Sequence, residues 1–145
     1  MDRKGSSSST KARATGTYGI QSWDEKTWDG KDHKQQPGAK LTHAKVVFDL
    51  HGDMEGEAKV QFLMSYRDDT FATFVALQQM TGRLGGRSGS FVVQVNGTFE
   101  NGAAKSTWTI IPGSGTDDLR GIRGEGSTVA HHGDSQPYTL DYYFE

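Results

Sequence analysis

The residue types best suited to acid–base chemistry stand close together near Trp23, with Glu25 two positions later. In an extended segment, positions i and i+2 share a face, so the indole and the carboxyl group are expected side by side. An apolar aromatic neighbour favours the protonated form of a carboxyl group, which suits a general acid or base. We therefore predict Glu25 as a catalytic residue, and the alternative is a solvated loop residue.

Arg87 is the second predicted catalytic residue, because a guanidinium group can orient the polar end of a ligand. Its glycine-rich surroundings fit an ordinary loop charge as well. Other aromatic and amide side chains suit the walls of a mostly apolar pocket. The predicted ligand-binding residues are Trp23, Tyr66, Phe74, Gln78, Trp108 and Tyr142. We expect all of these side chains around one mouth or lumen, and plain core filling is the alternative for the aromatic ones.

No metal site and no cofactor are predicted. His43 and His51 stand eight positions apart on one expected strand, a separation of about 26 Å at strand rise. The adjacent His131 and His132 lack a suitably spaced partner. The glycine-rich stretch 113–124 lacks the Lys-Ser/Thr pair of a phosphate-binding loop, so it predicts tight bends and bulges.

The elements that position these side chains follow from the hydrophobic pattern. Apolar and polar residues alternate with period two between turn signals, and no window keeps the spacing of an amphipathic helix. The pattern predicts strands at 14–22, 40–51, 57–67, 71–84, 88–100, 103–111, 119–131 and 138–145. Segment 23–39 breaks the alternation and is expected to be a long loop or short helical turn. It would form either a lid over one barrel mouth or a plain surface crossover.

The turns between these strands indicate hairpins. Asn101-Gly102 suits a tight primed turn, and Gly85-Gly86 can adopt positive φ. An open meander would leave two bare edges, which are removed when the first strand pairs with the last. The expected fold class is all-β, a closed antiparallel barrel of about eight strands, which encloses packed side chains or one small ligand. We expect residues 1–13 to form a flexible polar tail and residues 14–145 to form a single barrel domain.

The expected strand 88–100 leaves its orientation open. One face is apolar, with Phe91, Val93 and Val95, and the other carries Gln94 and Asn96. A packed barrel would turn the apolar face inward, whereas a barrel holding a polar ligand could turn the amides inward.

Composition excludes several classes of function. The 16 basic and 18 acidic residues give a net charge of -2, so we expect no nucleic-acid partner and no membrane partner. The chain has no cysteine, which excludes disulfides, iron–sulfur clusters and thiolate nucleophiles. No stretch resembles a signal peptide or a membrane span, so the expected location is cytoplasmic. Apolar residues on both faces of expected strands, as in Val46-Val47-Phe48, predict a homo-oligomer.

Several motifs together carry a family resemblance. They are Ser22-Trp23-Asp24-Glu25, the stretch 52–57, Leu63-Met64-Ser65-Tyr66, the stretch 85–91, the stretch 112–116 and the stretch 119–124. Through them, nearly all of 15–145 resembles the domain of unknown function 3224, a mainly bacterial family placed with the allene oxide cyclase-like barrels. The resemblance implies that barrel fold, and the wider superfamily includes cyclases and dirigent-like proteins. It implies no catalytic residues that could be carried over.

Two hypotheses for the function follow. The first is a barrel that binds one small hydrophobic or amphipathic organic molecule, and its enzymatic form is a cofactor-independent isomerase or cyclase that acts by templating and proton transfer. The second is a non-enzymatic binding or assembly protein with a packed barrel. The volume of the barrel interior discriminates between them, because a filled lumen favours the second.

Overall fold

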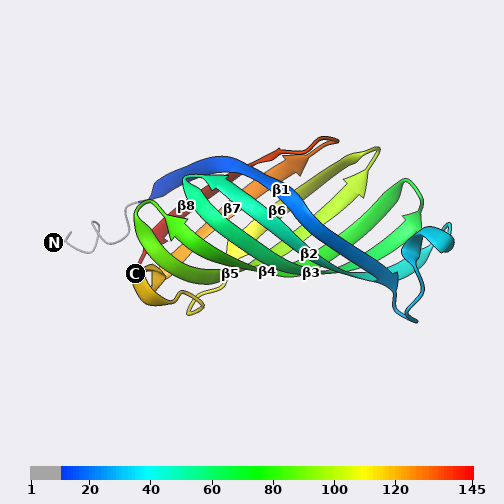
Figure 1. Ribbon diagram of the computed structural model, residues 1–145, viewed down its shortest axis with the longest axis horizontal. Helices are drawn as coiled ribbons and strands as arrows, with labels where there is room; N and C mark the ends of the chain where they lie inside the picture. The colour runs from blue at the N-terminus through cyan, green and yellow to red at the C-terminus, as the bar shows by residue number, and fades with distance from the viewer. Residues whose placement is uncertain (1–10) are drawn as a thin grey trace.

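The protein is an eight-stranded closed barrel in which the strands follow one another in sequence order (Figure 1). The computed structural model describes residues 11–145, and residues 1–10, which hold most of the expected polar tail, lie outside the described part. The strands are β1 (Ala12–Thr27), β2 (Lys40–Gly52), β3 (Met54–Asp68), β4 (Phe71–Leu84), β5 (Arg87–Glu100), β6 (Ala103–Ile110), β7 (Ile122–Ala130) and β8 (Gln136–Phe144). All neighbours are antiparallel, and β1 pairs with β8 to close the barrel. The predicted fold class is confirmed.

The first strand is longer than the pattern predicts. β1 continues past Ser22 to Thr27 and remains paired with β2 throughout. The register shifts between Ile20 and Ser22, which marks a β-bulge. A bulge adds one residue and interrupts the period-two alternation without ending the strand. The expected loop at 23–39 is therefore wrong for its first part, and only its remainder, with the 3-10 helix η1 (His33–Gln35), connects β1 to β2.

The seventh strand begins later than the pattern predicts. Leu119 belongs to a second 3-10 helix, η2 (Asp117–Leu119), and β7 starts at Ile122. Leu119 is completely buried, so it continues the apolar pattern of the strand although its backbone is helical. The chain turns between them at Gly121, which has a φ of 82°. The apolar pattern alone therefore placed the start of this strand too early.

Alternation along the strands decides which side chains face the interior. On β3, Val60, Phe62 and Met64 occupy alternate positions of one apolar face, and all three are buried. On β5, the residues at 91, 93 and 95 are buried, whereas Gln94 and Asn96 are exposed. The orientation left open by the sequence is thus the one in which the apolar face of β5 points inward.

The barrel has two ends, which we name after their 3-10 helices. The η2 end carries the β2–β3 and β4–β5 turns, the β6–β7 connection, the start of β1 and the end of β8. The η1 end carries the β1–β2 connection and the β3–β4, β5–β6 and β7–β8 turns. In Figure 1 the C-terminus lies at the η2 end, and the η1 segment projects from the opposite side of the molecule.

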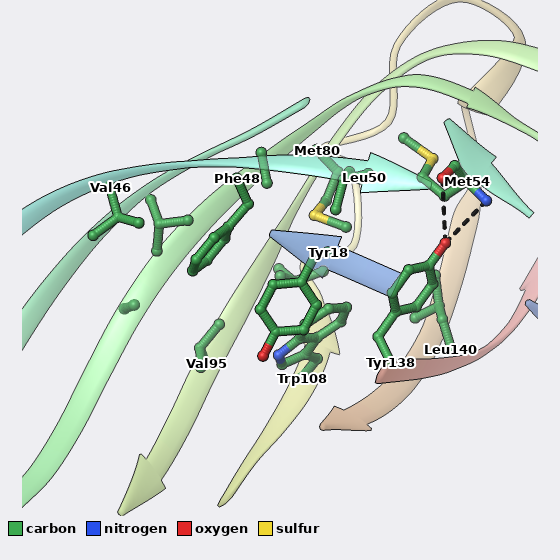
Figure 2. Close-up of a cluster of buried hydrophobic side chains, with 14 of the residues drawn as sticks. Tyr18, Val46, Phe48, Leu50, Met54, Met80, Val95, Trp108, Tyr138 and Leu140 are labelled. Carbon is green, nitrogen blue, oxygen red and sulfur yellow. Dashed lines mark hydrogen bonds between the residues drawn. The ribbon is translucent and has the colours of Figure 1, made fainter. Parts of the chain in front are cut away.

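Large apolar side chains fill the interior towards the η2 end (Figure 2). The fully buried ones include Leu50, Met54, Met80, Leu84, Ile110, Leu119, Ile122 and Leu140. Tyr138 reaches across this core, where its hydroxyl accepts a hydrogen bond from the Met54 amide at 3.1 Å and donates to the His51 carbonyl at 3.2 Å. Gly16 makes room for it, because a Cβ there would lie 2.5 Å from the Tyr138 hydroxyl. This tyrosine ties β8 to the β2–β3 turn.

Candidate ligand-binding site

A cavity of approximately 300 Å³ opens into the barrel from the η1 end. Aromatic side chains from several strands form most of its wall, namely Tyr18, Trp23, Phe48, Phe62, Tyr66, Phe74, Phe99 and Trp108. The β5–β6 turn at Gly102 and the β7–β8 connection at 131–134 contribute to its mouth. Trp108 also stacks on Tyr138, with ring centroids 6.0 Å apart, so it separates the cavity from the packed η2 end.

The aromatic wall is held by ring contacts between side chains of β1, β3 and β4. Trp23 stacks on Phe62 with centroids 5.7 Å apart, and Phe62 meets Phe74 edge to face at 5.5 Å. Such pairs contribute about 0.5–1.5 kcal/mol beyond the burial of their area. Gly97 on β5 leaves the space that the Phe74 ring occupies, because a Cβ at this position would lie 2.5 Å from that ring. The shape of the cavity therefore depends on an inward-facing glycine as well as on the rings.

Behind this wall, Glu25 is buried among hydrogen-bond donors, with 6% of the residue exposed. Its Oε1 accepts from the Trp23 indole at 3.0 Å. Its Oε2 accepts from the Thr42 hydroxyl at 2.7 Å and from the Tyr66 hydroxyl at 2.6 Å. From η1, the His33 Nδ1 donates to the Glu25 backbone carbonyl at 3.1 Å. Both carboxylate oxygens thus have partners, as a buried charge requires.

Two partners of Glu25, Trp23 and Tyr66, line the cavity, whereas Glu25 itself does not. Burial of the Tyr66 hydroxyl, together with its hydrogen bond to Glu25, raises the pKa of Tyr66 well above its usual range. Lys40 lies over the Tyr66 ring, with its Nζ 4.2 Å from the centroid. Tyr66 is consequently a neutral side chain whose proton points to Glu25 and whose oxygen retains accepting capacity. Glu25 positions Tyr66 and Trp23 in the wall.

Other polar groups also line the lumen. Gln78 on β4 lines the cavity, and its Nε2 lies 3.0 Å from the sulfur of Met80. Tyr18 and Thr128 are joined through their hydroxyls at 3.0 Å, and the Thr128 hydroxyl donates to the Pro137 carbonyl at 2.6 Å. A mostly apolar cavity with a few convergent polar groups is the usual form of a small-molecule site.

Comparison with known proteins places the chain in a family. The family model for proteins of unknown function DUF3224 matches residues 14–142. The chain belongs to the DUF3224 family. The crystal structure of a DUF3224 protein of unknown function from Shewanella oneidensis MR-1 is similar to it, with a TM-score of 0.76 and 22% sequence identity over 94% of this chain and 99% of that one. At this identity the likeness shows the fold alone. No match is found among proteins of curated function.

The DUF3224 barrel brings most of the predicted ligand-binding residues together. Trp23, Tyr66, Phe74, Gln78 and Trp108 all line the same cavity. Glu25 lies directly behind them, on a strand and buried, so the alternative of a solvated loop residue is wrong. The side-by-side arrangement of its carboxylate and the neighbouring indole is confirmed by their hydrogen bond. Whether these residues bind a ligand stays a prediction.

Two predicted site residues lie elsewhere in the DUF3224 barrel. Arg87 begins β5 and Tyr142 is near the end of β8, so both are at the η2 end. Arg87 is exposed, with its guanidinium carbon 4.1 Å from the centroid of the Phe144 ring and its Nη1 donating to the Asp118 carbonyl at 3.3 Å. The predicted cluster around one mouth is therefore wrong for these two residues. In an antiparallel barrel, strand starts alternate between the two ends, and composition does not reveal which end a residue occupies.

Several contributors to the site are not among the residues predicted for it. Thr42 and His33 hold Glu25, and Phe62 and Tyr18 line the cavity. For Phe62, its shared face with Tyr66 on β3 was a usable signal. For His33, no local signal exists, because it reaches Glu25 through the fold of the β1–β2 connection. Within residues 11–145, no group of three or more metal-binding side chains lies together, and no described helix is long and apolar enough to span a membrane.

Proposed function

We propose that this DUF3224 barrel binds one hydrophobic or amphipathic organic molecule in the cavity at the η1 end. The observation that carries the proposal is the approximately 300 Å³ lumen with aromatic walls, inside a barrel whose other end is filled. An apolar cavity of roughly 150 Å³ is enough to hold benzene in another protein. A molecule of two fused rings, or one of similar bulk, fits the larger volume here. A cytoplasmic location stays a prediction.

Isomerase or cyclase activity is the narrower form of this proposal. A shaped apolar cavity favours one conformation of a flexible substrate, which contributes to catalysis by orientation. Direct proton transfer by Glu25 is less well supported, because the carboxylate lies behind Tyr66 and both of its oxygens accept hydrogen bonds. Any proton exchanged with a ligand would pass through the Tyr66 hydroxyl. Ligand binding and conformational templating are therefore better supported than acid–base catalysis.

Native mass spectrometry of protein purified from its own host tests the proposal. We expect a retained organic mass that is lost on denaturation. The variant Ser106→Phe places a ring in the cavity from β6, and Thr107→Phe, on the exposed face of the same strand, is the matched control. The first variant should lose the ligand and the second should keep it. A wild-type protein without any bound organic molecule, which also fails to take up neutral naphthalene derivatives, would overturn the proposal.

The outer face of the barrel supports a second proposal, self-association. Leu63, Val75 and Leu77 are 47%, 45% and 56% exposed. They line an outer groove of approximately 1070 Å³ over β1 to β5. Asp24 and Lys45 lie at the same groove, so a second copy related by a two-fold axis would bring charges of both signs. We propose a second copy of this chain as the occupant of the groove.

Sedimentation velocity tests this assembly. The wild-type protein should sediment as a dimer, because a two-fold contact closes with two copies. Leu77→Lys should yield a monomer, because it introduces a charge into the apolar patch. Thr73→Lys, on the same exposed face of β4 but outside the groove, should leave the assembly intact. A wild-type monomer at high concentration contradicts self-association.

A further inference from the structure

The amide of Gln78 is buried without a strong hydrogen-bond partner. The residue is 2% exposed, and across residues 11–145 its side chain has the Met80 thioether as its hydrogen-bond partner and no other. A thioether is a weak acceptor and cannot donate. Whichever way the amide is turned, at least one of its polar atoms lacks a partner. Buried amides normally have strong partners, so an under-satisfied amide in a cavity wall indicates that a bound molecule supplies one.

Trp108 supplies a second unpaired polar atom in the same cavity. It is 4% exposed, and its indole N–H has no hydrogen-bond partner in the part of the chain that the structure describes. The indoles of Trp23 and Trp28, by contrast, donate to Glu25 and to the Thr42 carbonyl. Figure 2 shows the Trp108 nitrogen on the same side of the core cluster as the Tyr18 hydroxyl. Only β5 separates β4, which carries Gln78, from β6, which carries Trp108.

The charges around the cavity limit the kind of group that could reach these atoms. Among the described residues that line the cavity, none is a lysine or arginine. The titratable groups are His131, His132 and Asp134, which are exposed at the mouth, with Tyr18 and Tyr66 as neutral phenols in the wall. An anionic group deep in the lumen would lose its hydration without gaining a counter-charge. An ammonium group could not accept a hydrogen bond from the Trp108 indole, which only donates. The inner end of the ligand is therefore a neutral acceptor.

We infer that the ligand carries a neutral carbonyl or hydroxyl oxygen at the end that enters the barrel first. This inference rests on the proposed ligand-binding function and names the chemical class of the ligand. The oxygen accepts hydrogen bonds from the Trp108 indole and the Gln78 amide, and the apolar body lies against Phe62, Phe74 and Trp23. A ketone, an amide or an alcohol on a body of about two rings meets these conditions.

Three naphthalene probes of similar size test the chemical class. They are methyl naphthyl ketone, isopropylnaphthalene, which replaces the carbonyl with a methyl-bearing carbon, and the naphthoate anion. Affinities are measured by isothermal titration calorimetry with the sparingly soluble probe in the cell. Wild-type protein should bind the ketone more tightly than the naphthoate by about tenfold or more, because only the anion loses hydration without compensation.

Gln78→Met removes the amide at similar side-chain length. It should reduce the affinity ratio of ketone to hydrocarbon by about tenfold, since a site that pairs with a polar group discriminates against its absence. Gln79→Met, at the exposed neighbouring position of β4, is the matched control and should leave the ratio unchanged. Trp108→Phe removes the indole N–H and should also reduce this affinity ratio. This second variant still tests the inference if Gln78→Met fails to fold.

The outcomes separate this inference from the proposed function. An unchanged ratio in both cavity variants, or naphthoate binding as tight as ketone binding, overturns the chemical class while ligand binding stands. Failure of all three probes to bind the wild-type protein counts against the proposed function itself. A reduced ratio in both Gln78→Met and Trp108→Phe, with Gln79→Met unchanged, supports the inference.

Discussion

The two ends of the barrel use the same alternation of side chains for different purposes. At the η2 end, inward positions hold Leu50, Met54 and Leu84, and the buried hydroxyl of Tyr138 bonds to backbone groups of the adjacent turn. At the η1 end, inward positions hold aromatic rings around a cavity, with Glu25 bonded to side chains. The η2 end is thus a packed core, whereas the η1 end contains a cavity.

This difference shows how one small barrel can combine stability with a site. Burial of apolar area contributes most where side chains interdigitate without gaps. The η1 end gives up part of that packing around its lumen and holds the wall through hydrogen bonds to a buried carboxylate. If this division is right, equivalent substitutions at the two ends should have unequal effects on the free energy of unfolding.

The largest expected effect comes from two methionines on β3. Met54 is completely buried at the η2 end, whereas Met64 lines the cavity. Met54→Ala should lower the free energy of unfolding by about 2–5 kcal/mol, because it leaves a void in a filled core. Met64→Ala should cost less than half as much, since its side chain already borders open space. Urea unfolding monitored by tryptophan fluorescence measures both, and equal losses would contradict the comparison between the ends.

The next effect concerns the hydrogen bonds that hold the cavity wall. Tyr66→Phe removes the donor at 2.6 Å from the Glu25 carboxylate. It should lower the free energy of unfolding by about 1.5–3 kcal/mol, the range for a hydrogen bond to a charged group. Tyr143→Phe on β8, whose hydroxyl has no hydrogen-bond partner among the described residues, is the control. A loss no greater than that of the control would mean that the hydrogen bond from Tyr66 to Glu25 does not stabilise the native state.

The sequence predicted the packed parts of the barrel better than the site. Alternation on β3 was sufficient to assign Phe62, Met64 and Tyr66 to one inward face, because the strand has no irregularity there. On β1 the bulge between Ile20 and Ser22 hid the continuing strand. Glu25 could be paired with its neighbouring indole from spacing alone, but its burial depends on the strand continuing past the bulge. Local pattern is informative only where the register is regular.

The position of a residue along the barrel axis was the other quantity that alternation did not supply. Tyr142 and Tyr66 both lie two residues before the end of their strands, yet they are at opposite ends of the barrel. Period-two alternation distinguishes inside from outside and carries no information about height in the barrel. Height follows from strand direction and register, which become known only once the strand pairs are established.

A smaller effect should appear at alkaline pH. Burial raises the pKa of Tyr66, and the nearby Glu25 carboxylate raises it further. Above about pH 10, the usual pKa of tyrosine, the unfolded chain loses this proton while the native state keeps it. The unfolded state then binds fewer protons, so the free energy of unfolding falls as pH rises. Tyr66→Phe should make this decline shallower, as measured by urea unfolding between neutral and strongly alkaline pH. The same slope in the wild-type protein and the variant would contradict the contribution of Tyr66 to the decline.

The smallest expected effect is at Arg87, and it distinguishes the two ends most directly. Arg87 is exposed, and its contacts are the Phe144 ring and the Asp118 carbonyl, both at the η2 end. An exposed cation–π contact contributes about 0.5–1 kcal/mol, so Arg87→Ala should lower the free energy of unfolding by no more than that.

The same substitution should leave the affinity for the naphthyl ketone unchanged, because the cavity and Arg87 lie on opposite sides of the Trp108–Tyr138 stack. Glu25→Gln is the informative counterpart. This substitution weakens the acceptor for the hydrogen bonds from Tyr66 and Trp23, so these two side chains should be held less firmly in the cavity wall and ketone affinity should fall. Asp24→Asn, at the exposed neighbouring position, is the control and should leave ketone affinity unchanged. Calorimetry on the three variants decides between the ends. A fall in ketone affinity for Arg87→Ala, with no change for Glu25→Gln, would move the site to the η2 end and reinstate Arg87 as a ligand-orienting residue.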